Sequence, residues 1–454
     1  MENKKYNAEF IRLACHMPGV LYTPAVGSGS CRDKGNDKNS DTKNDANRDK
    51  SYEQSSEQCR DKSRIAVINI HPESDYLSHS IGPELASRGY TVLCANTRDA
   101  CGSLASKIFD VGIGMKYVKN LPEISKIVIC GHSGGASLMS AYQNLAENGV
   151  RTFQGDEKLI KCPDYLDGLQ PADGFLSLDS NWGLGAMRLF GLDPAVTNEQ
   201  SGLLIDEELN MFNPANGYDP SGSTYSDVFL RKFFKAQSDR NNKLIDFALE
   251  RNTLIDSGKG LYADDEPMIV PGAMYIGPNN KLFPQDIRFL CRTRAERTLV
   301  HTGGRTSVEV VHSLRKPKNG GSLTGSLYRG ALHTTVKKFL DSHAVRTVDG
   351  YGYDDAEVFG IDWQSSYNCV CGNVTGVTVP VLALGMTANW EFSAVETIYN
   401  NAGSSDKSMG FIEGADHDFN TDKTCERFDG EFGDTVRTTY DYIDKWLSAP
   451  GRFM

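Results

Sequence analysis

The sequence lacks any hydrophobic run that approaches the ~20 residues of a membrane-spanning helix. Its first residues, Met-Glu-Asn-Lys-Lys-Tyr-Asn, contain no apolar stretch of the kind found in a secretory signal. The formal net charge is −11, so the chain has no excess of positive charge to attract nucleic acid or an anionic membrane surface. We therefore expect a cytoplasmic protein with no membrane span and no nucleic-acid partner.

The chain also lacks a regular cysteine framework. Its 11 Cys are an odd number scattered over 454 residues, which indicates reduced thiols rather than disulfides. Cys369-Val-Cys371 has no partner pair at zinc-binding spacing, and Asp264-Asp-Glu266 lacks the spacing of a calcium loop. The phosphate-binding pattern G-x-x-x-x-G-K-[ST] is missing as well. The sequence thus predicts no metal site and no cofactor.

Residues 27–63 have almost no apolar side chains. This segment is rich in Ser, Asp, Lys, Asn and Arg, and Arg-Asp-Lys occurs in it three times. Such a composition cannot bury enough surface to offset the entropy of ordering, so we predict a disordered hydrophilic insert. Cys31 and Cys59 could bind a metal or form a disulfide, but a solvated insert with unreacted thiols is the simpler interpretation.

Elsewhere, short apolar runs alternate with helical patterns. After an opening hairpin at 10–23, buried strands are expected at 65–70, 91–96, 127–129, 175–178, 379–384 and 409–412. Helices are expected at 77–88, 108–119, 136–148 and 435–447. This alternation predicts the α/β class, with a mostly parallel, doubly wound sheet built from residues 1–181 and 377–454.

The periodicity changes between residues 182 and 376. A long helical pattern at 229–251 is surrounded there by loops rich in Pro and Gly. We therefore predict that 182–376 is a large, partly helical lid over the carboxyl ends of the strands, where open α/β sheets bind ligands.

One pattern carries most of the chemical information. The expected strand at 127–129 leads directly into Gly131-His132-Ser133-Gly134-Gly135, and a helix follows. A strand, G-x-S-x-G and a helix are the parts of a nucleophile elbow, in which the glycines allow close packing and the serine hydroxyl is exposed. Ser133 is therefore the candidate nucleophile.

A serine needs a base, and His417 is the best candidate. It lies in Glu413-Gly-Ala-Asp-His-Asp-Phe419, a loop directly after the last expected strand. The chain order nucleophile, acid, base places a hydrolase histidine there. His132, inside the elbow, is expected to pack beside the nucleophile and is also a candidate substrate-binding residue.

Three segments together resemble the α/β-hydrolase-fold serine hydrolases: Ile70-His71-Pro72, Gly131-His132-Ser133-Gly134-Gly135 and Gly414-Ala415-Asp416-His417. The chain also resembles a little-characterised group of bacterial α/β hydrolases, through Leu192-Asp193-Pro194 and Phe212-Asn-Pro-Ala-Asn-Gly217. The resemblance implies hydrolysis of a carbonyl compound and names no substrate.

The resemblance further implies an oxyanion hole made of two backbone N–H groups. One belongs to Gly134, the residue after the nucleophile. The other comes from the loop that begins at His71 and Pro72; because Pro72 has no N–H, the donor is His71, Glu73 or Ser74, and we favour Glu73. The His71 side chain could instead bind the leaving group or brace the loop.

The acid of the triad is not fixed by the sequence. Many α/β hydrolases carry an Asp a few residues after the strand that precedes the histidine strand, but the loop 385–396 contains none. Glu391 lies in that loop, Glu396 begins the following helix, and Asp179 follows an earlier strand, a position that some lipases use. All three remain candidates.

These observations predict a serine hydrolase that cleaves an ester, thioester or small amide of a small-molecule acyl substrate. The same residues could support carbon–carbon bond hydrolysis or acyl transfer. A non-catalytic binding protein on the hydrolase scaffold is the third alternative, since fold does not fix function. The sequence does not indicate an oligomeric state.

Overall fold

The computed structural model describes residues 5–25, 62–201, 204–273, 281–317 and 331–454. The predicted insert 27–63, with Cys31 and Cys59, lies outside the described residues except for positions 62 and 63. Its proposed disorder therefore stays a prediction.

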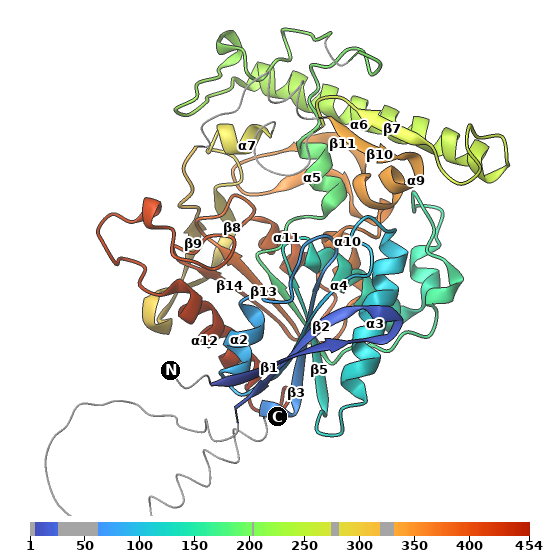
Figure 1. Ribbon diagram of the computed structural model, residues 1–454. Helices are drawn as coiled ribbons and strands as arrows, with labels where there is room; N and C mark the ends of the chain where they lie inside the picture. The colour runs from blue at the N-terminus through green and yellow to red at the C-terminus, as the bar shows by residue number, and fades with distance from the viewer. Residues whose placement is uncertain (1–4, 26–61, 202–203, 274–280, 318–330) are drawn as a thin grey trace, which may run out of the picture.

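Ten strands form one sheet at the centre of the fold (Figure 1). They are β1 (Tyr6–Arg12), β2 (Pro18–Pro24), β3 (Ile65–His71), β4 (Thr91–Asn96), β5 (Lys126–His132), β6 (Gly174–Leu178), β8 (Arg292–Val300), β9 (Thr306–His312), β13 (Val381–Met386) and β14 (Lys407–Ile412). Their order across the sheet is β1-β2-β4-β3-β5-β6-β13-β14-β8-β9. The strands from β4 to β8 in this order are parallel. At the two edges the pairings β1–β2, β2–β4 and β8–β9 are antiparallel. The predicted α/β class with a mostly parallel sheet is confirmed.

Helices cover both faces of this sheet. One face carries α2 (Ile81–Ala86) and α12 (Thr435–Leu447), and the other carries α3 (Leu104–Lys119), α4 (Gly135–Asn148), α10 (Val370–Asn373) and α11 (Ala394–Asn401). Successive residues of a strand point to opposite faces. Accordingly, Val67 of β3 packs in the same core as Ile443, whereas its neighbour Ile68 packs in the core that contains Leu138.

The remaining described α-helices and strands form a layer beyond the sheet, at the top of Figure 1. They are α5 (Leu184–Phe190), α6 (Asp227–Asp256), β7 (Pro267–Val270), α7 (Leu282–Gln285), β10 (Leu332–Thr335), α9 (Val336–Lys338), β11 (Arg346–Tyr353) and β12 (Val358–Asp362). Two small antiparallel sheets, β7 with β10 and β11 with β12, belong to this layer. We call it the cap.

Not every element of the range predicted as a lid, 182–376, belongs to the cap. Strands β8 and β9 lie within that range but extend the central sheet, where Leu299 and Val300 pair with Phe411 and Ile412 of β14. The first part of β8 reads Arg-Thr-Arg-Ala-Glu-Arg, so it lacks the apolar run by which buried strands are recognised. Short α10 also packs against α4 rather than in the cap.

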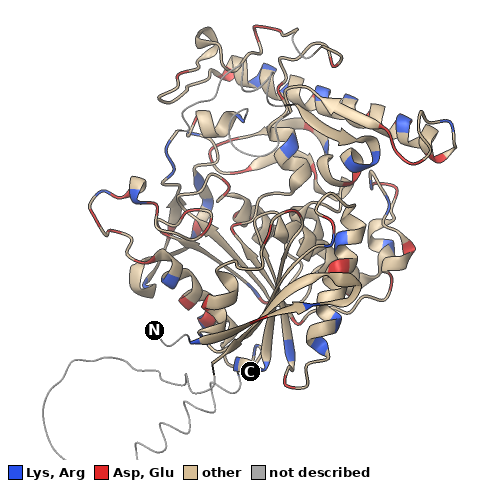
Figure 2. Ribbon diagram, in the orientation of Figure 1, with Lys and Arg blue, Asp and Glu red and all other residues tan. Residues whose placement is uncertain are grey.

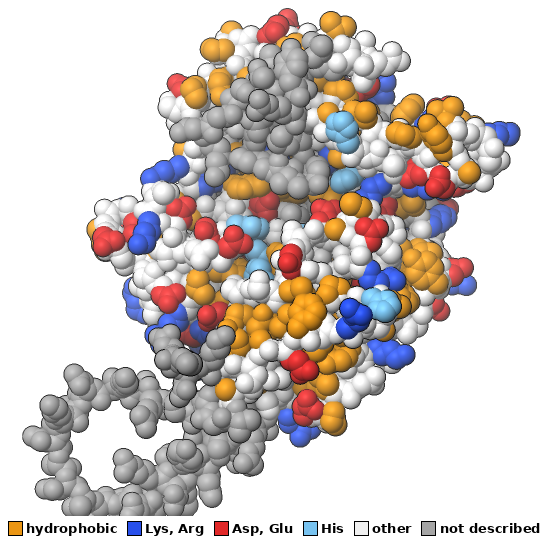
Figure 3. Space-filling view, in the orientation of Figure 1, with side chains coloured by type: hydrophobic (Ala, Val, Ile, Leu, Met, Phe, Trp, Pro, Cys, Tyr) orange, Lys and Arg blue, Asp and Glu red, His pale blue; other side chains and the backbone are white. Residues whose placement is uncertain are grey.

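Charged residues are spread along the ribbon, with Lys and Arg interspersed among Asp and Glu (Figure 2). Hydrophobic side chains gather over the N-terminal hairpin on the face shown in Figure 3, and Phe10 of β1 is 69% exposed. None of the described helices combines the length and the apolar character that crossing a bilayer requires.

Candidate active site

Ser133 occupies a sharp turn between β5 and α4. Its φ is +56°, in the left-handed region that costs an L-residue roughly 1–2 kcal/mol. A Cβ on Gly131 would lie 2.3 Å from Cα of Ala136, so glycine is required where the strand and the helix meet. This is the geometry of a nucleophile elbow, and it presents the serine at the carboxyl end of β5.

His417 and Asp179 are hydrogen-bonded to each other. Nδ1 of His417 donates to Oδ2 of Asp179 across 2.7 Å. Asp179 directly follows β6 and is fully buried; it also accepts from the N–H of Met386 at 2.9 Å and from Nδ2 of Asn389 at 2.6 Å. Asp179 is thus held by the last residue of β13 and by the loop that follows it.

The bond to Asp179 also sets the proton affinity of His417. Burial lowers the pKa of the imidazole, but the hydrogen bond and the charge of Asp179, with the charges of Glu391 and Asp418, raise it by more. The net effect is a His417 pKa of about 9. Because Nδ1 is engaged as a donor, Nε2 is the ring nitrogen left to exchange a proton with another group.

The two glutamates proposed as alternatives occupy different places. Glu396 accepts from the N–H of Arg294 at 2.6 Å and from Nε of Arg297 at 2.7 Å, so it ties α11 to β8. Glu391 lies on the wall of the pocket that holds Ser133 and His417, and burial raises its pKa to about 7. Of the three candidate acids, all of them described, Asp179 is the one hydrogen-bonded to His417.

Asn389 was not anticipated from the sequence. It stands in the loop after β13, where an Asp was sought and not found. Its Nδ2 lies 2.6 Å from Oδ2 of Asp179 and 3.1 Å from Nδ1 of His417, so the amide sits beside both members of the pair. A polar residue at the usual position of the acid was the signal in the sequence that could have identified it.

The expected second oxyanion donor is engaged elsewhere. The N–H groups of Glu73 and Ser74 donate to Nδ1 of His71, at 3.1 and 2.9 Å. The Gly134 N–H, in contrast, has no acceptor among the described residues, as is usual in the first turn of a helix. The N–H of Gly134 is therefore available to donate to a ligand, whereas the N–H of Glu73 is used to hold the ring of His71.

His132 lies behind His417 and away from the pocket wall. Its Nε2 is 2.8 Å from the backbone oxygen of His417, and its Nδ1 is 2.7 Å from the hydroxyl of Tyr76. The rings of His132 and His417 are 4.6 Å apart. Both ring nitrogens of His132 are thus engaged by neighbouring groups, and His132 is not among the residues that line the pocket of Ser133, so its predicted contact with substrate stays a prediction.

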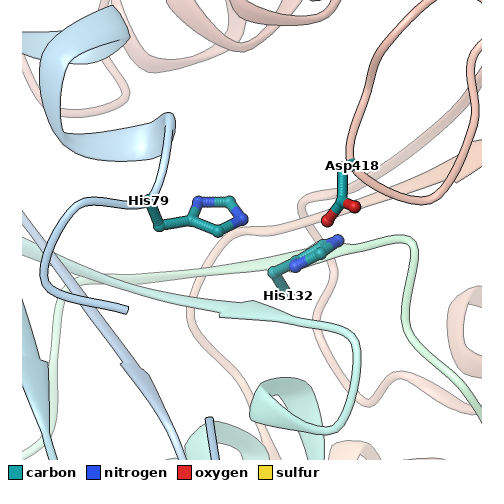
Figure 4. A group of neighbouring side chains, drawn as sticks. All are labelled: His79, His132 and Asp418. Carbon is teal, nitrogen blue, oxygen red and sulfur yellow. The ribbon is translucent and has the colours of Figure 1, made fainter. Parts of the chain in front are cut away.

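His79, His132 and Asp418 converge closely enough to be considered as metal ligands (Figure 4), with one atom of each within 4.8 Å of the others. A carbonyl oxygen can only accept, so Nε2 of His132 must carry the proton in its bond to His417. Nδ1 is then the acceptor for Tyr76, and the imidazole has no free lone pair for a metal. The hydrogen bonds thus favour a structural role for this cluster.

A pocket of about 350 Å³ joins these residues. Ser133, Gly134, His71 and His417 line it from the sheet. Leu184, Met187, Ser342 and Asn368 line it from the chain segment between 182 and 376. The pocket therefore lies between the carboxyl ends of the strands and this segment, which includes α5 of the cap.

The strand order and the elbow decide the fold. The chain has an α/β-hydrolase fold. No protein-family model and no curated protein matches the chain.

Solved α/β hydrolases resemble the chain weakly. The siderophore hydrolase EstB from Aspergillus fumigatus is 11% identical, with 98% of each chain covered and a TM-score of 0.41. Est1E from Butyrivibrio proteoclasticus is 10% identical, with 97% of each chain covered and a TM-score of 0.34. The α/β hydrolase GrgF from Penicillium sp. sh18 is 10% identical over 97% of this chain and 98% of its own, with a TM-score of 0.36. Likenesses of this degree carry no argument about substrate.

Proposed function

We propose that the protein is a serine hydrolase that cleaves an ester, thioester or small amide of a small acyl compound. The single observation that carries the proposal is the hydrogen-bonded Asp179–His417 pair, whose imidazole lines the same pocket as Ser133. A serine is activated by a base that a third group orients, and these residues match that arrangement.

The reaction would proceed in two halves. Nε2 of His417 takes the proton of the Ser133 hydroxyl while Oγ attacks the substrate carbonyl, and the N–H of Gly134 donates to the oxygen that becomes negative. His417 then gives its proton to the leaving group as the carbonyl re-forms, leaving an acyl group on Ser133. Water activated by His417 releases that acyl group and restores the hydroxyl. Asp179 stabilises the imidazolium in both halves.

The conformation of Ser133 supports catalysis over simple binding. A serine with φ of +56° is retained at a cost that glycine would avoid, and such strain concentrates at functional sites. The pocket volume of about 350 Å³ suits a compact acyl compound. Carbon–carbon hydrolysis and acyl transfer use the same residues, and no contact among the described residues favours either.

The test is labelling by a fluorophosphonate probe together with a panel of p-nitrophenyl esters of graded acyl length. We expect the probe to modify Ser133 and the shorter esters to be hydrolysed. Ser133→Ala, the matched control, should show neither labelling nor more than a residual rate. A wild-type protein that neither reacts with the probe nor hydrolyses any ester of the panel would disprove the proposal.

A further inference from the structure

We propose that the side chain of His71 supplies the second donor of the oxyanion hole, through Nε2–H, in place of a backbone N–H from the loop that follows β3. This inference rests on the proposed serine-hydrolase function.

The proton position on His71 follows from its neighbours. Nδ1 accepts hydrogen bonds from the N–H of Glu73 at 3.1 Å and from the N–H of Ser74 at 2.9 Å. A ring nitrogen that accepts must present its lone pair, so the neutral imidazole carries its proton on Nε2. Two backbone donors therefore fix a single tautomer, in which Nε2 is always a donor.

The ring also stays neutral. Burial lowers the pKa of His71 to about 3, and the positive charge of Lys107 acts in the same direction. A neutral donor can stabilise a developing oxyanion without exchanging a proton with it, as a backbone N–H does.

Nε2 of His71 lies next to Gly134, whose N–H is the first donor of the proposed oxyanion hole. A Cβ built on Gly134 would be 3.3 Å from Nε2 of His71, so this nitrogen adjoins the backbone whose N–H begins the oxyanion hole. His71, Gly134 and Ser133 line the same pocket. No acceptor for Nε2 lies within hydrogen-bonding distance among the described residues, which leaves this N–H available to a ligand.

Two of the three backbone donors considered from the sequence, those of Glu73 and Ser74, are occupied. Pro72 has no N–H, and those of Glu73 and Ser74 point to the ring of His71. The loop thus uses two N–H groups to orient one imidazole N–H. The result is one donor in the pocket of Ser133, the Nε2–H of the His71 side chain.

Stacking holds the ring in place. The rings of His71 and Tyr76 are 4.7 Å apart at 17°, and those of Tyr76 and His79 are 4.5 Å apart at 4°. Tyr76 is in turn fixed by the bond from its hydroxyl to His132. A donor fixed before the substrate arrives needs no reorganisation during the reaction, which is what makes oxyanion holes effective.

Two amide substitutions separate this role from bracing of the loop. In His71→Asn the amide oxygen stands near the position of Nδ1 and keeps the acceptor for Glu73 and Ser74, but nothing replaces Nε2–H. In His71→Gln the amide nitrogen reaches toward the position of Nε2 and keeps a donor. With p-nitrophenyl acetate as the probe, we expect His71→Asn to lower kcat about 10²–10³-fold with little change in KM. We expect His71→Gln to retain at least about tenfold more activity than His71→Asn.

A trifluoromethyl ketone that forms a hemiketal with Ser133 gives a second readout. Its affinity should fall in His71→Asn in parallel with kcat, because the hemiketal carries the oxyanion, and should fall less in His71→Gln. If His71→Asn keeps wild-type kcat and ketone affinity, or if both variants lose them equally at an unchanged Tm, the inference is wrong and His71 braces the loop. A wild-type protein that fails to react with a fluorophosphonate would instead overturn the serine-hydrolase proposal, and this inference with it.

Discussion

The carboxylate of Asp179 lies 2.7 Å from Nδ1 of His417, although the two residues are 238 positions apart in the chain. Adjacent parallel strands make this contact possible. Asp179 directly follows β6, which pairs with β13, and β13 pairs with β14, which is followed by the loop of His417. The carboxyl ends of these strands meet at one edge of the sheet, so residues that follow them converge.

Replacement of Asp179 should distinguish it from the other candidate acids. Asp179→Asn keeps the shape of the side chain but removes the charge that orients and stabilises the imidazolium, so kcat should fall about 10³–10⁴-fold. Glu391→Gln should change kcat far less, since Glu391 makes no hydrogen bond to His417. Steady-state kinetics on one ester, with Tm measured for each variant, checks this.

Glu396→Gln is the control that separates a loss of stability from the loss of kcat expected for Asp179→Asn. Its carboxylate accepts from Arg297 and from the backbone of β8, so its loss should lower the free energy of unfolding by roughly 1–3 kcal/mol while kcat stays near wild type. Wild-type turnover in Asp179→Asn, or a loss in Glu396→Gln as large as that expected for Asp179→Asn, would contradict the assignment.

The pH dependence should follow the raised pKa of His417. The base must be neutral to accept the serine proton, so kcat/KM should rise with pH along a limb whose midpoint lies well above the ordinary 6.5, toward about 9. Asp179→Asn removes the carboxylate that raises this pKa, and the limb should move to lower pH. A wild-type midpoint at or below 6.5 would contradict the expected shift.

The same shift has a consequence for stability. A histidine whose pKa is higher in the folded protein than in the unfolded chain stabilises the fold below the unfolded value of about 6.5. That contribution is lost as the pH rises through about 9. The wild-type protein should therefore lose more Tm between pH 6.5 and pH 9.5 than Asp179→Asn does.

Local patterns in the sequence predicted much of this architecture. The β-branched run at 127–129, the glycines around Ser133 and the helix ending at Gly149 depend on neighbouring residues, and β5, the elbow and α4 appear where they were expected. The amphipathic pattern at 435–447 likewise coincides with α12. Short-range periodicity carries this information because it reflects the burial of each element.

The order of strands was beyond the reach of such patterns. Which of three acids meets His417 depends on β6 lying beside β13, and no local pattern of apolar residues specifies that pairing. The charged start of β8 likewise concealed a strand at the edge of the sheet. Asn389 carries no charge, so a pattern of acidic residues does not reveal it; its amide acts by contacting Asp179, which follows another strand.

Ser133→Gly and Ser133→Ala should differ in stability but not in activity. Both lack the nucleophile, so both should fall to a residual rate. Ala keeps a Cβ in the left-handed conformation, whereas Gly adopts φ near +56° without strain, and so Ser133→Gly should be the more stable variant by up to about 1 kcal/mol. Chemical denaturation of the two variants measures the difference. A more stable Ala variant would contradict the prediction, because it would show that position 133 does not keep its positive φ when the side chain is changed.

An exchange of the acid and the amide tests the site as a unit. Nδ2 of Asn389 lies 3.1 Å from Nδ1 of His417, so Asn389→Asp places a second carboxylate within reach of the imidazole. In the background of Asp179→Asn, that carboxylate should orient His417 in place of the lost one, while the amide now at position 179 occupies the buried site without a charge. We expect kcat of the double variant to be at least about tenfold higher than kcat of Asp179→Asn, because the imidazole regains a charged partner.

Asn389→Asp alone is the control for this exchange, and it should behave differently. Two carboxylates would then face one imidazole in a buried site, and like charges this close cannot both ionise easily, so one of them should bind a proton with a raised pKa. Its kcat should stay within about tenfold of wild type, because Asp179 still orients His417, and its Tm should fall as the pH rises. If the double variant is no more active than Asp179→Asn while its Tm matches that of the single variant, a carboxylate at position 389 cannot orient His417, and the requirement for an acid is specific to the end of β6.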